Sequence, residues 1–80
     1  MLTFKDLKSA YISTVQFGML HGANYDNAKH GNELLNHFCK GMVDNSNYNN
    51  NDKSTMKQDL DLTKETLSIE IDNYYKSNGS

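Results

Sequence analysis

The sequence predicts an all-α protein that folds as a small three-helix domain. Three stretches carry apolar residues at the spacing of an amphipathic helix, and a polar, asparagine-rich run separates the second stretch from the third. The third stretch contains neither glycine nor proline. We therefore expect helices at about residues 3–21, 26–43 and 54–76, a polar loop at 44–53, a single domain over 1–76 and a disordered tail at 77–80.

The first predicted helix has a signal at each end. Thr3 followed by Asp6 resembles a capping box, in which each side chain bonds a free backbone N–H group of the first turn. Gly22 is a natural terminator directly after the helix. The residues between them that recur at helical spacing are Phe4, Leu7, Tyr11, Val15, Gly18 and Met19.

The second predicted helix has an uncertain start. Its apolar residues cover one broad side, namely Ala28, Gly31, Leu34, Leu35, Phe38, Met42 and Val43. Gly31 destabilises a helix interior by up to about 1 kcal/mol relative to alanine. An alternative start at Asn32, a good N-cap, with residues 24–31 as an irregular connection, therefore stays open.

The third predicted helix competes with a β-strand interpretation. Its stripe consists of Met56, Leu60, Thr63, Leu67, Ile71 and Tyr74. Residues 60–62 and 67–72 alternate between apolar and polar, as a strand does. The run is too long for one strand, and its charged residues are compatible with a helix, so we expect a helix.

Composition and charge suggest the setting of the protein. The chain has 80 residues with a net charge of −2, divided as +1 over residues 1–43 and −3 over residues 44–80, which argues against a phosphate-backbone binder. Abundant asparagine and lysine, with no arginine, indicate an AT-rich genome such as that of a bacterium, its phage or a plasmid. The sequence has no apolar signal region and no apolar span of about 20 residues, so we expect no membrane contact. The single cysteine also fits a reducing compartment. We therefore expect a cytoplasmic location, which includes the cytoplasm of an infected host.

Two apolar residues of the third helix predict a contact surface. Leu62 and Ile69 lie one heptad apart on the side opposite the main stripe. Phe17 and Leu20 lie behind the stripe of the first helix. Tyr48, Tyr74 and Tyr75 are possible aromatic anchors, and an acidic rim of Asp59, Asp61, Glu65 and Asp72 would steer a basic partner.

A metal or proton site is a weaker hypothesis. Asp26, His30, Glu33 and His37 fall on one stripe of a continuous second helix, and acid–histidine pairs four residues apart can chelate a divalent metal or orient a general base. One helix brings only two ligands within reach of the same ion, so a solvated polar face is the simpler interpretation. Cys39 is expected to be a small buried thiol, and we predict no cofactor.

A helix-turn-helix DNA-binding regulator is the other alternative. The first two helices would form the motif around residues 22–25, and Lys29, Asn32, Asn36 and Lys40 would face the groove. The lack of arginine and the negative net charge make nucleic acid an unlikely ligand.

The sequence therefore predicts a non-enzymatic protein-binding module. The concrete hypothesis is an inhibitor or adaptor, encoded by a phage or mobile element, that occludes a host or defence protein. The identity of that target is not predicted. Self-association into a homo-oligomer is also expected to be possible, because a chain of this size has a small core.

Overall fold

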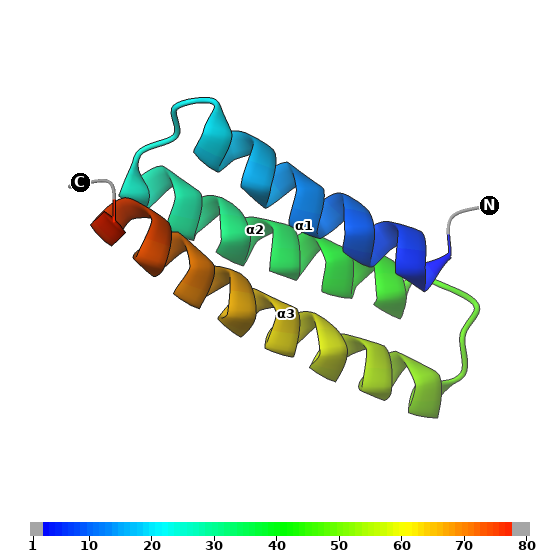
Figure 1. The fold of residues 1–80 in the computed structure, drawn as a ribbon. Coiled ribbons are helices and arrows are strands. Elements are labelled where there is room, and N and C mark those ends of the chain that lie inside the picture. Colours follow the sequence, from blue (N-terminus) through cyan, green and yellow to red (C-terminus); the bar gives the residue numbers. More distant parts are fainter. Residues whose placement is uncertain (1–2, 78–80) are drawn as a thin grey trace.

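The computed structural model describes residues 3–77 and confirms a small all-α fold (Figure 1). It contains α1 (Phe4–Leu20), α2 (Tyr25–Asp44) and α3 (Asn50–Ser77), and no strand occurs among the described residues. Consecutive helices run antiparallel, so α1 and α3 point the same way (Figure 1). The strand interpretation of residues 60–72 is wrong, because this segment lies within α3.

Side-chain caps explain where the first two helices begin. Thr3 forms the predicted capping box with Asp6, with bonds of 3.1 and 3.2 Å between the side chain of one residue and the backbone N–H of the other. Asn24 accepts a 2.8 Å bond from the backbone N–H of Asn27, so α2 starts at Tyr25. Gly31 lies inside a continuous helix, and the alternative start at Asn32 is wrong.

The loop between α2 and α3 is shorter than expected. Asn49 accepts a 2.8 Å bond from the backbone N–H of Asp52 and acts as the N-cap of α3. The helix therefore begins at Asn50, and the connection spans only residues 45–49. Within the asparagine-rich run, the side chains that favour turns also favour helix caps. At the other end, α3 includes Ser77, and residues 78–80 of the predicted tail lie outside the described residues.

Gly22 ends α1 as predicted. Its φ of 96° is in the left-handed region that glycine tolerates. The chain can therefore reverse, and the backbone N–H of Ala23 donates to the carbonyl oxygen of Gly18 at 3.0 Å. This tight reversal places α2 directly beside α1.

The core lies where the three helices meet. α1 and α3 bury the stripes that their sequences predict, and the residues most enclosed are Tyr11, Val15, Met19, Leu60, Leu67 and Ile71. Tyr75 is also buried, and its hydroxyl donates to the carbonyl oxygen of Ala23 at the turn after α1. The prediction that Tyr75 anchors a partner is therefore wrong.

α2 turns only part of its predicted apolar side to the core, since Ala28 and Val43 are buried and Leu35 packs against the core. Its buried residues are Ala28, Asn32, Asn36, Cys39 and Val43. Leu34, Phe38 and Met42, which belong to the broad apolar side, remain exposed. The buried stripe of α2 thus includes two asparagines and leaves three large apolar side chains in water.

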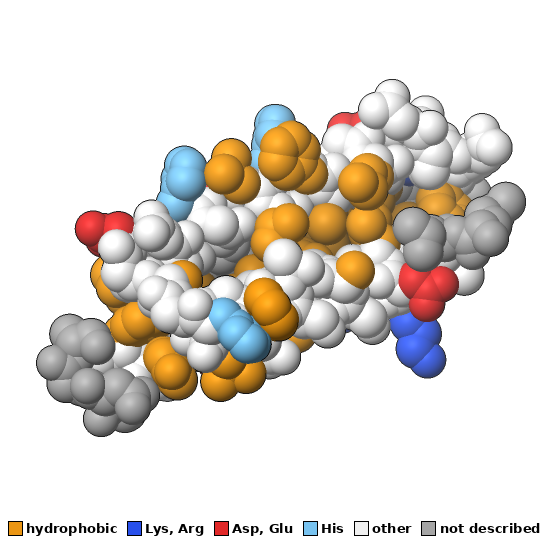
Figure 2. Space-filling model, turned by 90° about the horizontal axis from the view of Figure 1, so that it is seen from above, with side chains coloured by type: hydrophobic (Ala, Val, Ile, Leu, Met, Phe, Trp, Pro, Cys, Tyr) orange, Lys and Arg blue, Asp and Glu red, His pale blue; other side chains and the backbone are white. Residues whose placement is uncertain are grey.

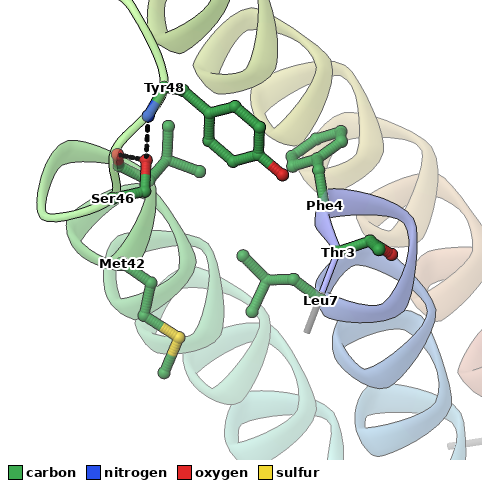
Figure 3. A pocket seen from close by; sticks show the side chains of 7 residues that line it. Thr3, Phe4, Leu7, Met42, Ser46 and Tyr48 are labelled. Carbon is green, nitrogen blue, oxygen red and sulfur yellow. Dashed lines mark hydrogen bonds between the residues drawn. The ribbon is translucent and has the colours of Figure 1, made fainter. Parts of the chain in front are cut away.

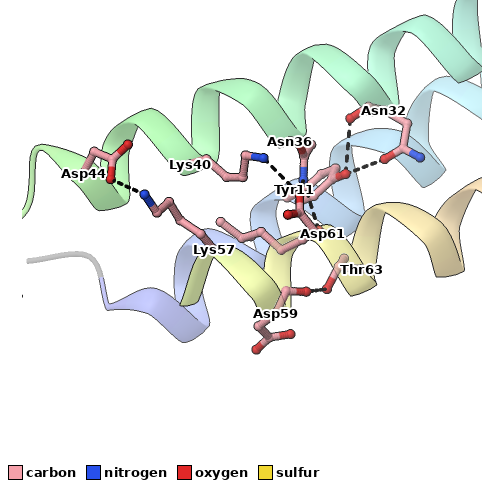
Figure 4. A network of polar contacts seen from close by, with 10 residues as sticks. Tyr11, Asn32, Asn36, Lys40, Asp44, Lys57, Asp59, Asp61 and Thr63 are labelled. Carbon is pink, nitrogen blue, oxygen red and sulfur yellow. Dashed lines mark hydrogen bonds and ion pairs between the residues drawn. The ribbon is translucent and has the colours of Figure 1, made fainter. Parts of the chain in front are cut away.

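Hydrogen bonds to α1 and α3 explain the buried asparagines (Figure 4). The Tyr11 hydroxyl donates to the side-chain oxygen of Asn32, and the Asn32 amide donates to the carbonyl oxygen of Lys64 at 2.9 Å. The Asn36 amide donates to the carbonyl oxygen of Leu60 at 3.1 Å. Burial raises the pKa of Tyr11, so this hydroxyl keeps its proton over the whole neutral range. Among the described residues, every buried side-chain polar atom has a hydrogen-bond partner.

None of the helices in residues 3–77 combines the length and the apolar content needed to cross a bilayer.

Candidate protein-binding surfaces

Leu62 and Ile69 form an exposed pair on the outer side of α3. Leu60, two positions before Leu62, is fully buried, and Ile71, two positions after Ile69, is fully buried too. A step of two residues turns a helix by about 200°, so the pair points away from the core. Their exposed fractions are 64% and 62%. We call these two residues the α3 outer pair.

The predicted acidic rim beside this pair is largely engaged within the fold. Asp61 accepts from Lys40 at 3.0 Å and from the Asn36 amide at 3.2 Å. Asp72 accepts from the Tyr25 hydroxyl at 2.6 Å and from Lys29 at 3.0 Å. Both carboxylates therefore hold α3 against α2.

Two further carboxylates are also paired, whereas one is available at the rim. Asp59 pairs with Lys8 of α1 at 2.9 Å. Asp44 pairs with Lys57 at 2.8 Å (Figure 4). Glu65 is exposed and makes no ion pair with any described residue. Of the predicted rim, Glu65 is the carboxylate that a partner would meet without displacing an internal lysine.

Acid is expected to weaken the contact between α2 and α3. The hydrogen bond from Lys40 lowers the pKa of Asp61, and the bonds from Tyr25 and Lys29 lower the pKa of Asp72. Because the unfolded value is about 3.9, these pairs stabilise the fold above that pH, and the stabilisation is lost as the pH falls through the lowered folded-state pKa. Thermal unfolding of the wild type should therefore have a lower midpoint at pH 3 than at pH 7. The Asp61→Asn variant should show a smaller difference, and an unchanged difference would contradict this account.

The predicted contact residues of α1 are exposed. Phe17 and Leu20 have exposed fractions of 61% and 72%. The Phe17 ring stacks on the imidazole of His21 with centroids 4.0 Å apart. Tyr74, another predicted anchor, is half-buried and packs edge-on against Tyr75. The predicted aromatic anchors are therefore dispersed, and one of them, Tyr48, lines a pocket.

That pocket lies between the start of α1 and the end of α2 (Figure 3). It has a volume of about 210 Å³, and Phe4, Leu7, Met42 and Tyr48 provide its apolar lining. Tyr48 belongs to the connection after α2 and is 39% exposed. The structure thus brings the predicted anchor Tyr48 together with residues that the sequence assigned to two separate helices.

Three apolar residues of α2 extend this pocket into a larger surface. Leu34, Phe38 and Met42, spaced four residues apart, are 42%, 57% and 57% exposed, and we call them the α2 apolar row. Phe38 and Met42 also line a second, shallow hollow of about 440 Å³ with His37, Gly41 and Asn45. Figure 2 shows hydrophobic side chains gathered along the middle of one long face of the molecule.

The sequence contained a signal for this surface. The apolar residues of α2 span a wider arc than one neighbouring helix can cover, because a helix packed on one side needs a stripe of about 100°. The signal could have been read as two stripes, one for the core and one for another contact.

The histidine–carboxylate stripe does not form a metal site. Asp26, His30, Glu33 and His37 are all exposed on α2. Within residues 3–77, no three histidine, cysteine or acidic side chains lie close enough together to hold a metal ion. Cys39 is buried as expected, and burial raises the pKa of its thiol, which disfavours the reactive thiolate.

The predicted DNA-reading face is engaged inside the protein. Asn32 and Asn36 are buried against α3, and Lys29 and Lys40 pair with its carboxylates. These four side chains therefore cannot enter a groove while α3 is in place. The prediction that they face nucleic acid is wrong.

Comparisons with protein-family models, with curated proteins and with solved structures give no match to this chain, so inferences about its function come from these surfaces.

Proposed function

We propose that this protein is a non-enzymatic module that acts by binding another protein. One observation carries the proposal: a fold with a closed core leaves large apolar side chains exposed, and two groups of them lie on separate faces. These are the α2 apolar row and the α3 outer pair. Grouped apolar residues on a small protein commonly mark contact surfaces, whereas isolated ones are ordinary.

We assign the target to the α3 outer pair. Leu62 and Ile69 offer two apolar contacts, and the exposed Glu65 lies between them in sequence on the same outer side of α3. A partner with a small apolar patch beside a lysine or arginine would match this arrangement. Such charges raise the rate and specificity of association more than the affinity.

The narrower hypothesis, an inhibitor or adaptor encoded by a phage or mobile element, is supported only by composition. The short, asparagine- and lysine-rich chain is typical of such proteins. Occlusion of a host or defence protein would require contact alone, which fits a surface without a catalytic set of residues.

Replacing both Leu62 and Ile69 with lysine should abolish target binding. Each substitution removes an apolar contact worth about 1.5–3 kcal/mol, so the affinity for the target should fall at least about tenfold per site. Capture of proteins from the native cytoplasm with tagged wild type and tagged variant measures the effect. The helical circular-dichroism signal should be unchanged, because both residues are exposed.

A matched control adds the same charges to the same helix. Gln58→Lys and Asn73→Lys change exposed polar residues of α3, so this double variant should still capture the target. If the Leu62 and Ile69 variant retains full capture, the α3 outer pair is not the target site. If both variants lose capture equally, the effect comes from charge alone.

A further inference from the structure

The surface formed by the α2 apolar row and the adjoining pocket has no role in the target contact just proposed. Its exposed side chains are Leu34, Phe38, Met42 and Tyr48, and the half-buried Phe4 and Leu7 line the pocket from α1. We call this surface the α1/α2 face. No residue of α3 lines either of its hollows, so it is separate from the α3 outer pair.

The α1/α2 face carries no lysine or carboxylate side chain, and His37 lies at the border of its second hollow. The two lysines of α2, Lys29 and Lys40, lie on the other side of the helix and pair with carboxylates of α3. Figure 2 shows the charged side chains at the edges of the face, away from its apolar centre. Two copies of such a face can therefore meet without placing like charges against each other.

The exposed apolar area is close to what a stable dimer needs. Four large side chains, each about half exposed, leave roughly 400 Å² in water if a large side chain has about 150–250 Å². A standard interface buries about 800 Å² per partner, of which roughly 60% is apolar. The face therefore supplies most of the apolar area expected of one half of such an interface.

The row is also suited to two-fold symmetry. Phe38 lies midway between Leu34 and Met42, about 6 Å along the helix from each. In a symmetric dimer, one patch meets its own copy, so an axis near Phe38 would stack the two phenylalanines and place apolar residues on both sides. Gly41 lies beside the row, and nothing lies within 4 Å of the position where a Cβ would stand, so the second helix can approach closely.

We propose that the α1/α2 face is the interface of a homodimer whose two-fold axis passes near Phe38. The target-binding α3 outer pairs would then be presented on separate surfaces of the dimer. A bivalent arrangement of this kind strengthens binding to a target that itself offers two sites. The dimer does not depend on the target assignment, because the two surfaces share no residue.

The mass in solution tests the proposal. Sedimentation equilibrium or light scattering at about 1–100 µM should give twice the chain mass of 9.1 kDa for the wild type. Phe38→Lys should give the single-chain mass at the same concentrations while keeping its helical signal, since Phe38 is exposed. The Leu62→Lys and Ile69→Lys double variant should remain dimeric, which separates this interface from the target site.

An engineered disulfide tests the position of the axis. In a Cys39→Ala background, Phe38→Cys should form a covalent dimer on mild oxidation, because the two sulfurs would lie close together at the axis. Leu62→Cys in the same background places a comparably exposed thiol outside the interface and should form no covalent dimer under the same oxidation. A single-chain mass for the wild type throughout the range, or a dimer that survives Phe38→Lys, overturns the proposal. A monomeric wild type that still captures its target would refute the dimer and leave the proposed function standing.

Discussion

Replacing Leu60 with alanine should destabilise the fold by about 2–5 kcal/mol, the range for deleting a buried leucine side chain. Leu60 is fully buried at the centre of α3, where α1 and α2 both pack against this helix. The removed atoms lose their burial, and the surrounding side chains cannot fully close the cavity. A chain of 80 residues has a total stability of only about 4–12 kcal/mol, so the variant should be largely unfolded at moderate temperature.

Leu62→Ala is the matched control for this prediction. It makes the same chemical change two positions along the same helix, at a side chain that is 64% exposed. Its effect should lie within about 0.5 kcal/mol. Urea unfolding followed by circular dichroism, at one protein concentration for all variants, measures both changes. Similar losses for the two variants would mean that α3 does not pack by the side observed.

Replacing Asn32 with leucine should destabilise the protein by about 1–3 kcal/mol although it adds apolar volume to the core. The Asn32 side chain accepts from the buried Tyr11 hydroxyl and donates to the carbonyl oxygen of Lys64. Leucine removes both bonds and places a branched side chain against a polar hydroxyl. The buried hydroxyl then loses its shorter hydrogen bond without gaining one from water.

A double-mutant cycle with Tyr11→Phe isolates this effect. Tyr11→Phe alone leaves the Asn32 oxygen unpaired, whereas the double variant removes both partners and leaves an apolar contact. The double variant should therefore be more stable than the sum of the two single changes predicts. Asn73→Leu, at an exposed position of α3, should be nearly neutral. Simple additivity in the cycle would show that the Tyr11–Asn32 bond contributes nothing to stability.

Much of the fold could be predicted because its signals are local. A capping box depends on two residues three positions apart, and Thr3 and Asp6 form it as expected. The positive φ of Gly22 follows from a glycine placed directly after an apolar helix. The stripe of α3 predicted its buried side, and the same stripe placed the α3 outer pair outside the core.

The orientation of α2 could not be predicted in this way. Apolarity favoured the side that contains Leu34 and Phe38, whereas the structure buries the side that contains Asn32 and Asn36. Burial of an asparagine costs free energy unless donors and acceptors from other helices form hydrogen bonds with its side-chain amide. Those partners, the Tyr11 hydroxyl and the backbone carbonyls of α3, lie 21 to 32 positions away in the chain.

The sequence by itself determined the helical class of this protein, the approximate extent of its three helices and the side that α1 and α3 turn to the core, since these depend on spacing and on residues within a few positions of each other. Only the tertiary structure decided which side of α2 is buried, which carboxylates are paired and which apolar residues remain in water. The physical reason is that burial of a polar group depends on partners brought near by folding, and no pattern within one helix specifies where those partners will lie.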